Sequence, residues 1–315
     1  MTAVSPTSLD RCLPPMTHAD FLPGFSSFDI EVDAGIRIHG RRAGRGPPVL
    51  LLHGHPQNHA TWHAVAPRLV AAGFTVVAAD LRGYGDSSRP PGGEQHRNYS
   101  KRAMASDQVA LMRALGHDRF SVVGHDRGGR VAHRMALDHA EALDHVAVLD
   151  IAPTATMYRN TDREFATRYF WWFFLIQPEP LPETMIAANP EFFLRSHLSA
   201  QSRTAGVPSE ALVQEYLRCY RIPGTIHAIC EDYRAAAGID LQHDADDDGR
   251  PVTVPLLVLW GAHGVVGQLY DVLATWRDKA TNVRGRPLAC GHCLQEEKPL
   301  ETSEAIVEFL RERLT

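Results

Sequence analysis

Residues 121–130 read S-V-V-G-H-D-R-G-G-R: an apolar run, a glycine, an acid among charged residues, and two more glycines. Glycine has no Cβ atom, so it tolerates strained turns and lets neighbouring backbones approach closely. The stretch predicts a buried strand, a tight turn that carries Asp126, and a helix that follows the turn. Such a turn presents its central side chain at the end of a strand, as nucleophiles are presented in many enzymes. In the simpler interpretation, Asp126 only caps the helix.

A similar strand-like pattern recurs along the chain as short runs rich in Val, Leu and Ile, bounded by Gly, Pro or Asp. Several runs lack polar alternation, which is typical of strands buried on both faces of a parallel sheet. Helical patterns between them indicate a three-layer α/β domain, in which the first two strands form a hairpin. The predicted strands are 28–32, 36–41, 49–52, 74–79, 120–123, 146–149, 256–260 and one within 281–288; the predicted helices are 58–72, 101–115 and 127–139.

The alternation of strands and helices stops after Asp150. Residues 153–250 are aromatic-rich and helical in pattern, with R-Y-F-W-W-F-F-L at 168–175 and an acidic loop at 244–250. Strand-like sequence resumes at Val254, which indicates a helical cap inserted between two strands of one sheet. We therefore predict an N-terminal tail at 1–20, a core domain at 21–152 and 251–315, and a cap domain at 153–250.

The composition excludes several classes of function. The chain has 315 residues and a formal net charge of −5, so no electrostatic footprint for nucleic acid or an anionic membrane is expected. No apolar stretch reaches the roughly 18 residues that a spanning helix needs. The N-terminus lacks a basic region followed by an apolar one, so we expect no signal peptide, and Met1 and Met16 both stay open as the start.

The cysteines indicate reduced thiols rather than disulfides or a metal site. There are five, an odd number, and without an export signal this favours a cytoplasmic protein. Cys290 and Cys293 form a lone C-x-x-C pair. A structural zinc site usually needs a second such pair, so we predict no metal.

The presence of an aspartate at the turn indicates a particular kind of chemistry. An aspartate alkylated at oxygen is an ester, and water can cleave that ester at the carboxyl carbon with a histidine as general base. An Asp126 nucleophile therefore suits attack on saturated carbon, as in dehalogenation or epoxide opening. The stretch H53-G-H-P56 follows another predicted strand, and the backbone N–H groups of His55 and Arg127 are predicted to form the oxyanion hole for the ester step.

The general base is expected late in the chain, after the last strand. His292 lies there in A289-C-G-H-C293, so we predict it as the base. The histidine needs an acid to hold its tautomer, and Asp150 at the end of the strand 146–149 is the predicted partner. The stretch after Trp260 has no acid before Asp271. His59 and His63 could align with His55 as ligands, but no carboxylate in that helix completes a set, so we interpret them as ordinary helix residues.

Arg127 and Arg130 lie three residues apart, on one face of the predicted helix. Two guanidinium groups beside Asp126 would clamp a carboxylate well, because arginine binds planar anions through paired hydrogen bonds. A substrate carboxylate held there would be aligned for in-line attack. Alternatively, both arginines pair with structural acids.

The chain resembles the fluoroacetate (haloacetate) dehalogenases of the α/β-hydrolase superfamily from about residue 20 to the C-terminus. The stretches that carry the resemblance are L-L-L-H-G-H-P-Q, A-D-L-R-G-Y-G, Y-S-K-R-A-M-A, G-H-D-R-G-G-R-V, A-V-L-D-I-A-P-T, Q-P-E-P-L-P-E, C-E-D-Y-R-A and G-H-C-L-Q-E-E. The resemblance implies a mostly parallel eight-stranded sheet flanked by helices, with the cap inserted after the sixth strand. It also implies a homodimer, no cofactor, a nucleophilic Asp126 with Asp150 and His292, and a carboxylate clamp of Arg127 and Arg130.

The family holds the departing halide with a His-Trp pair and a tyrosine of the cap. The tyrosine corresponds to Tyr233 and the tryptophan to Trp172, whereas Trp171 stands at the histidine position. Gln201 also stands where the family has a tryptophan. Trp171 can donate an indole hydrogen bond but cannot carry a proton, so the preferred halogen stays open.

Three functional hypotheses follow. The first is hydrolysis of a small 2-haloacid to the 2-hydroxy acid and halide. The second is epoxide hydrolysis by the same Asp-His-Asp residues, with cap tyrosines protonating the epoxide oxygen; the candidates are Tyr158, Tyr169, Tyr216 and Tyr220. The third is a binding protein on a hydrolase scaffold.

Overall fold

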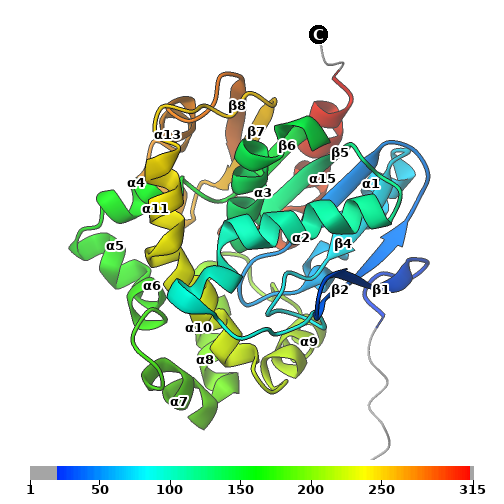
Figure 1. The fold of residues 1–315 in the computed structure, drawn as a ribbon. Helices are drawn as coiled ribbons and strands as arrows, with labels where there is room; N and C mark the ends of the chain where they lie inside the picture. The colour runs from blue at the N-terminus through cyan, green and yellow to red at the C-terminus, as the bar shows by residue number, and fades with distance from the viewer. Residues whose placement is uncertain (1–19, 313–315) are drawn as a thin grey trace, which may run out of the picture.

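The computed structural model describes residues 20–312, so predictions for the first 19 residues lie outside the described part. Its centre is an eight-stranded sheet in the order β1-β2-β4-β3-β5-β6-β7-β8 (Figure 1). The strands are β1 Ser26–Asp33, β2 Ile36–Ala43, β3 Pro48–Leu52, β4 Thr75–Ala79, β5 Phe120–His125, β6 Leu143–Leu149, β7 Leu256–Gly261 and β8 Val283–Leu288.

Most of the sheet is parallel. Strands β1 and β2 form the predicted antiparallel hairpin, β2 also runs antiparallel to β4, and the pairs from β4 through β8 are all parallel. The carboxyl ends of the parallel strands therefore meet at one edge of the sheet, which is where ligands bind in open α/β sheets.

Helices cover both faces of the sheet (Figure 1). Along each central strand, alternate residues belong to two hydrophobic clusters, as the period of two requires. Leu50 and Leu52 pack toward α2 and α3, whereas Val49 and Leu51 pack toward α1 and α15. These helices are α1 Ala66–Ala71, α2 Lys101–Ala114, α3 Arg127–Asp138 and α15 Pro299–Leu310, with α12 Val265–Leu269, α13 Val272–Arg277 and α14 Leu294–Glu297 near the C-terminal strands.

Eight further helices separate β6 from β7, and we refer to them as the helical insertion. They are α4 Thr154–Arg159, α5 Arg163–Arg168, α6 Phe170–Phe174, α7 Leu181–Ala188, α8 Pro190–Gln201, α9 Glu210–Tyr220, α10 Thr225–Ala237 and α11 Ile239–Asp246. The predicted fold class is confirmed, including the position of the insertion after the sixth strand. The division into core and cap domains at residues 153 and 250 stays a prediction.

Two local predictions were wrong. Residues 58–72 form a 3₁₀ turn at His59–Trp62 and then the short helix α1, because Pro67 has no N–H and fits only the first turn of a helix. The predicted loop 244–250 begins inside α11. Asp244 and Asp247 pair there with the buried Arg134 of α3, which orders the acidic segment.

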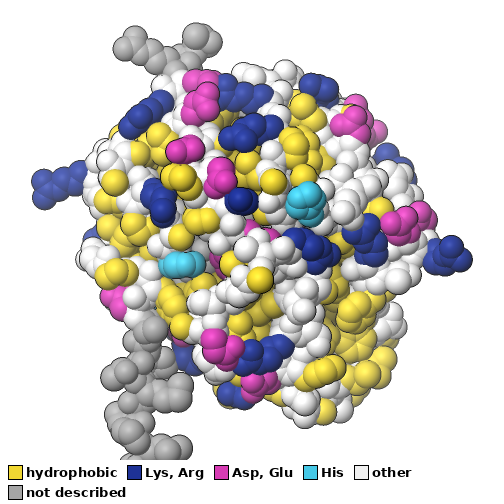
Figure 2. Space-filling model, turned by 180° about the vertical axis from the view of Figure 1, so that it is seen from behind, with side chains coloured by type: hydrophobic (Ala, Val, Ile, Leu, Met, Phe, Trp, Pro, Cys, Tyr) yellow, Lys and Arg dark blue, Asp and Glu magenta, His cyan; other side chains and the backbone are white. Residues whose placement is uncertain are grey.

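The predicted cap of α2 is present: the Ser100 hydroxyl accepts a hydrogen bond from the N–H of Ala103, at 3.2 Å. Within residues 20–312, none of the helices has the length and apolar character needed to cross a membrane. On the face drawn in Figure 2, acidic and basic side chains are interspersed rather than gathered into a basic patch.

Candidate active site

Asp126 lies at the turn between β5 and α3, and its backbone is strained. Its φ is +46° and its ψ is −113°, a conformation that residues with a side chain rarely adopt. A Cβ atom at Gly124 would collide with the backbone of Gly128, and one at Gly128 would collide with the carbonyl of His53. The glycines of the opening stretch are therefore required by close packing around the turn.

The loop after β3 meets the Asp126 carboxylate. The backbone N–H of His55 donates a hydrogen bond to Asp126 Oδ2, at 3.1 Å. The other predicted donor, the N–H of Arg127, is the first N–H of α3 and has no partner within the helix. The His55 ring lies between two tyrosines, with Nε2 2.8 Å from the Tyr220 hydroxyl and Nδ1 3.4 Å from the Tyr233 hydroxyl. Burial lowers the pKa of His55 to about 3, so this ring is neutral.

His292 and Asp150, far apart in sequence, form a short hydrogen bond. His292 Nδ1 lies 2.6 Å from Asp150 Oδ2, and the N–H of Gly261 donates to Asp150 Oδ1 at 2.8 Å. Asp150 follows β6 and has a positive φ of +51°. His292 Nε2 is buried and has no hydrogen-bond partner among residues 20–312. This nitrogen is therefore available for proton transfer.

The charges of these groups are coupled. Burial opposes ionisation of Asp126, but the positive charges of His292, Arg127 and Arg130 outweigh it and lower the pKa of Asp126 below 3.8. Burial also lowers the pKa of His292, yet the hydrogen bond and charge of Asp150, with the charge of Asp126, raise it above 6.5 overall. The carboxylate of Asp126 is thus ionised and ready to act as a nucleophile.

Arg127 pairs with an acid that the sequence analysis did not identify. Its Nε and Nη2 donate to the carboxylate of Asp232 in α10, at 2.8 and 2.7 Å, and Nη2 also donates to the Asp232 carbonyl. The ring of Tyr233 lies 4.2 Å from the Arg127 guanidinium. Two of the three guanidinium nitrogens of Arg127 are therefore engaged in a salt bridge within the protein, as the alternative interpretation expected.

Arg130 has a different environment. It is 4% exposed, and its hydrogen-bond acceptors within residues 20–312 are all neutral: the Thr154 hydroxyl at 2.8 Å, the Ala152 carbonyl at 3.2 Å and the Met157 sulfur at 3.3 Å. Its Nε is buried without a partner. The guanidinium lies 4.7 Å from the ring of Trp172. A buried cation that lacks a bonded carboxylate is costly, so this position favours an anionic ligand.

Two of the three predicted halide-binding residues pack against the arginines, and the third packs elsewhere. Tyr233 packs on Arg127 and Trp172 packs on Arg130. Trp171 packs instead against the ring of His197, with 4.4 Å between ring centroids. His197, like Asp232, was missed by the sequence analysis, because neither residue has a local motif that marks it.

A set of backbone contacts holds the His292 loop. Glu297 accepts hydrogen bonds from the N–H groups of Gly291 and Cys293, on both sides of His292, at 3.0 and 3.1 Å. It also accepts from the N–H of Arg203, at 2.9 Å, just beyond α8. The N–H of His292 donates to the Gln201 carbonyl at 3.1 Å. Glu297 thus connects the loop of the predicted base to the helical insertion.

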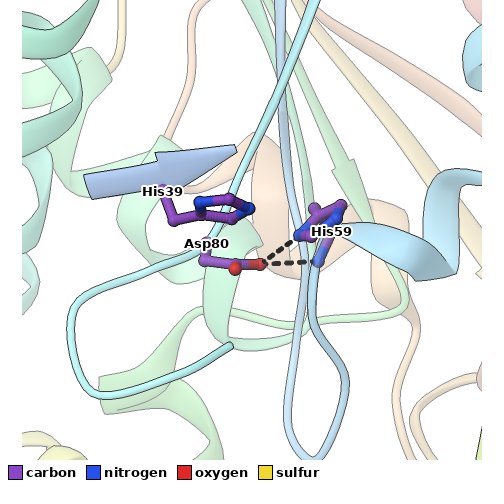
Figure 3. A group of neighbouring side chains, drawn as sticks. All are labelled: His39, His59 and Asp80. Carbon is purple, nitrogen blue, oxygen red and sulfur yellow. Dashed lines mark hydrogen bonds and ion pairs between the residues drawn. The ribbon is translucent and has the colours of Figure 1, made fainter. Parts of the chain in front are cut away.

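Another histidine cluster has a structural explanation. His39, His59 and Asp80 lie together at the carboxyl end of β4, with potential ligand atoms within 4.8 Å of one another (Figure 3). Asp80 Oδ1 accepts hydrogen bonds from both the backbone N–H and Nδ1 of His59, and Oδ2 accepts from the N–H of Asp86. Because the carboxylate is already satisfied by these donors, we interpret the cluster as support for the loops around it.

Comparison with known proteins identifies the class. Residues 47–299 match the family model described as the alpha/beta hydrolase fold. An α/β hydrolase from Nostoc sp PCC 7120 superposes with a TM-score of 0.91 at 54% identity, covering 93% of this chain and 100% of that one. The chain therefore belongs to the α/β-hydrolase fold family.

A closer relationship is visible within that fold. The chain is 47% identical to a "Fluoroacetate dehalogenase" of Burkholderia sp over 89% of this chain and 92% of the relative, and it belongs to that family. It is also 33% identical to a "Soluble epoxide hydrolase" of Corynebacterium sp. (strain C12), over 87% of this chain and 94% of the relative. Both relatives match nearly their whole length.

Proposed function

We propose that the protein hydrolyses small 2-haloacids, such as haloacetate, to the 2-hydroxy acid and halide. The observation that carries the proposal is the buried cation of Arg130, whose hydrogen-bond acceptors within residues 20–312 are all neutral and whose charge interacts with that of Asp126. A haloacid supplies the missing carboxylate and places its α-carbon near the nucleophile. The fluoroacetate dehalogenase relative supports this substrate class.

The reaction has two steps. In the first, an Asp126 oxygen attacks the α-carbon, the carbon–halogen bond breaks, and the halide leaves with the bonding electron pair. In the second, His292 Nε2 takes a proton from water while the water oxygen bonds to the Asp126 carboxyl carbon. The N–H groups of His55 and Arg127 stabilise the oxyanion. When the ester bond breaks, His292 returns its proton to the leaving alkoxide, and Asp126 releases the remaining proton to solvent.

A halide-release panel tests the proposal. The purified protein should release halide from chloroacetate, bromoacetate and fluoroacetate, and Asp126→Asn should release none above background. In ¹⁸O-labelled water, a single turnover should place the label in Asp126 rather than in the product, because water attacks the carboxyl carbon. Folded protein that fails on all three acids would overturn the proposal.

The raised pKa of His292 predicts a pH dependence. The second step needs the neutral imidazole, so kcat should rise with pH through the pKa of this histidine. Alkylation of Asp126 removes a negative charge that helps to raise that pKa, so the rise in kcat should be centred below the pKa of His292 measured in the free enzyme. The depressed pKa of Asp126 keeps the nucleophile ionised throughout this range. NMR titration of His292 and the kcat profile measure the two values.

The hydrogen bonds of Glu297 predict a positioning effect. Glu297→Ala removes the acceptor shared by Gly291, Cys293 and Arg203, so His292 should lose its alignment with Asp126. We expect kcat on chloroacetate to fall about 10- to 100-fold, with KM changed little. Glu297→Gln keeps one acceptor oxygen and should recover part of the rate. Equal changes in kcat and KM would indicate a fault in substrate binding instead.

One observation favours epoxide hydrolysis as a second candidate. The hydroxyl of Tyr158 is buried and has no hydrogen-bond partner among the described residues 20–312, and its ring packs against Trp172, so it could protonate an epoxide oxygen. Two of the other candidate tyrosines are already engaged: Tyr216 donates to Glu296 at 2.7 Å, and Tyr220 bonds to His55. An assay with styrene oxide separates the candidates, and Tyr158→Phe should abolish activity if the epoxide is the substrate.

A further inference from the structure

His197 is a buried imidazole that the proposed mechanism leaves unused. It lies in α8 and is 4% exposed. Neither of its ring nitrogens has a hydrogen-bond partner in the described part of the chain. Leaving a buried polar atom unpaired is costly, so such an atom commonly has a ligand or a water as its partner.

The position of His197 connects it to the reacting groups. Its ring contacts the His55 ring edge-on, with 4.5 Å between centroids, and the N–H of the same His55 bonds to Asp126. On another side it contacts Trp171 at 4.4 Å. One turn further along α8, the Gln201 carbonyl holds the N–H of His292. Helix α8 thus contacts both the loop after β3, which carries His55, and the loop that carries His292.

The protonation state of His197 suits a hydrogen-bond donor. Burial, together with the nearby histidines, lowers its pKa well below 6.5, although Asp126 and the nearby backbone carbonyl of His55 oppose this. The ring is therefore neutral, with one N–H donor and one acceptor nitrogen. The edge-on contacts with Trp171 and His55 fix its orientation.

We propose that His197 donates a hydrogen bond to the departing halide in the first step. It would supply, from α8, the imidazole that is absent at Trp171. The inference rests on the proposed function, because it assigns a residue to the leaving group of that reaction. As the Asp126 oxygen bonds to carbon, negative charge develops on the halogen; the His197 N–H stabilises it, and the proton stays on nitrogen. Fluoride is the strongest hydrogen-bond acceptor of the halides, so its release should depend most on this donor.

The test isolates the first step. In a His292→Asn background the ester is not hydrolysed, so a single burst of halide reports only carbon–halogen cleavage. Adding His197→Leu should slow the fluoride burst from fluoroacetate about 10- to 100-fold, the effect of losing a hydrogen bond to a charged group. The bromide burst from bromoacetate should slow much less. His197→Gln keeps an N–H donor and should restore much of the fluoride rate.

A control is His133→Leu, since His133 is also a neutral histidine, but it is partly exposed and packs against Trp276. It should leave the fluoride-to-bromide ratio unchanged. The bromide burst shows that each variant is folded and binds substrate. If His197→Leu slows both bursts equally, or neither, the inference is overturned while the proposed function stands. If the parent releases no halide from any acid, the proposed function itself fails.

Discussion

Replacing His292 by asparagine should give a protein that releases one equivalent of halide and then stops. The first step needs only the ionised Asp126, whereas the second needs a base at Nε2, and asparagine cannot accept the proton. Loss of a general base lowers the rate of such a step by about 10²–10⁴-fold, which is enough for the ester to accumulate. Intact-protein mass spectrometry after incubation with chloroacetate should therefore show the gain of one carboxymethyl group, and peptide mapping should place it within residues 121–130.

The control for this experiment is Asp126→Asn, which keeps the shape of the turn but removes the nucleophile. It should neither release halide nor gain mass. A modification on any other residue would contradict Asp126 as the nucleophile. Unchanged turnover by His292→Asn would contradict His292 as the base and turn attention to another group near the ester.

Among the proposed substitutions, replacing Asp232 by alanine should lower the free energy of unfolding the most. Its carboxylate is fully buried and bonds to three partners: Arg127, the Lys101 ammonium and the Tyr84 hydroxyl. The charges of Arg127 and Lys101 outweigh burial and lower the pKa of Asp232 below 3.8. Removing it leaves the buried Arg127 without its counter-ion and leaves Lys101 with the more distant Asp240 carboxylate, at 3.5 Å. Breaking a buried ion pair in this way typically costs about 3–5 kcal/mol. Urea unfolding, followed by tryptophan fluorescence, measures the change.

A surface pair provides the matched control. Arg195 in α8 and Glu210 in α9 form a close pair at 2.6 Å between two helices of the insertion, but their side chains are 38% and 65% exposed. Solvent screens such a pair, so Glu210→Ala should shift the unfolding midpoint far less than Asp232→Ala. Equal shifts would show that the Asp232 network is worth no more than a surface contact. Asp232→Asn, which keeps the shape and the hydrogen-bond acceptor, should lie between the two.

The Asp232 network also indicates how Arg127 and Arg130 would share the binding of a carboxylate in the proposed clamp. Because Asp232 occupies Nε and Nη2 of Arg127, that side chain is held rigidly between α3 and α10. Arg130, in contrast, is a buried guanidinium whose bonded acceptors in the described part of the chain are all neutral. We therefore expect Arg130 to supply most of the attraction for the substrate carboxylate, with Arg127 acting mainly through its position.

The sequence by itself determined the sheet, the strained turn at Asp126 and the positions of His292 and Asp150. These depend on local signals: apolar runs of strand length, glycines where backbones touch, and residues placed directly after strands. Parallel strands then bring their carboxyl ends to one edge, so the order of the motifs was enough to predict that they converge. Of the two local predictions that were wrong, the helix at 58–72 failed at Pro67, where a local rule should have been applied, and the loop at 244–250 failed because part of it lies in α11.

Only the tertiary structure decided the partners of the charged and polar groups. Asp232 lies 105 residues from Arg127, and His197 meets His55 and Trp171 through packing of α8 that no motif encodes. Side chains of arginine, aspartate and histidine satisfy their hydrogen bonds with whatever the folded chain brings within about 3 Å, and sequence spacing does not fix that choice. The predicted nucleophile could therefore be proposed from ten residues, whereas the environment that we expect to select its substrate and leaving group required the whole fold.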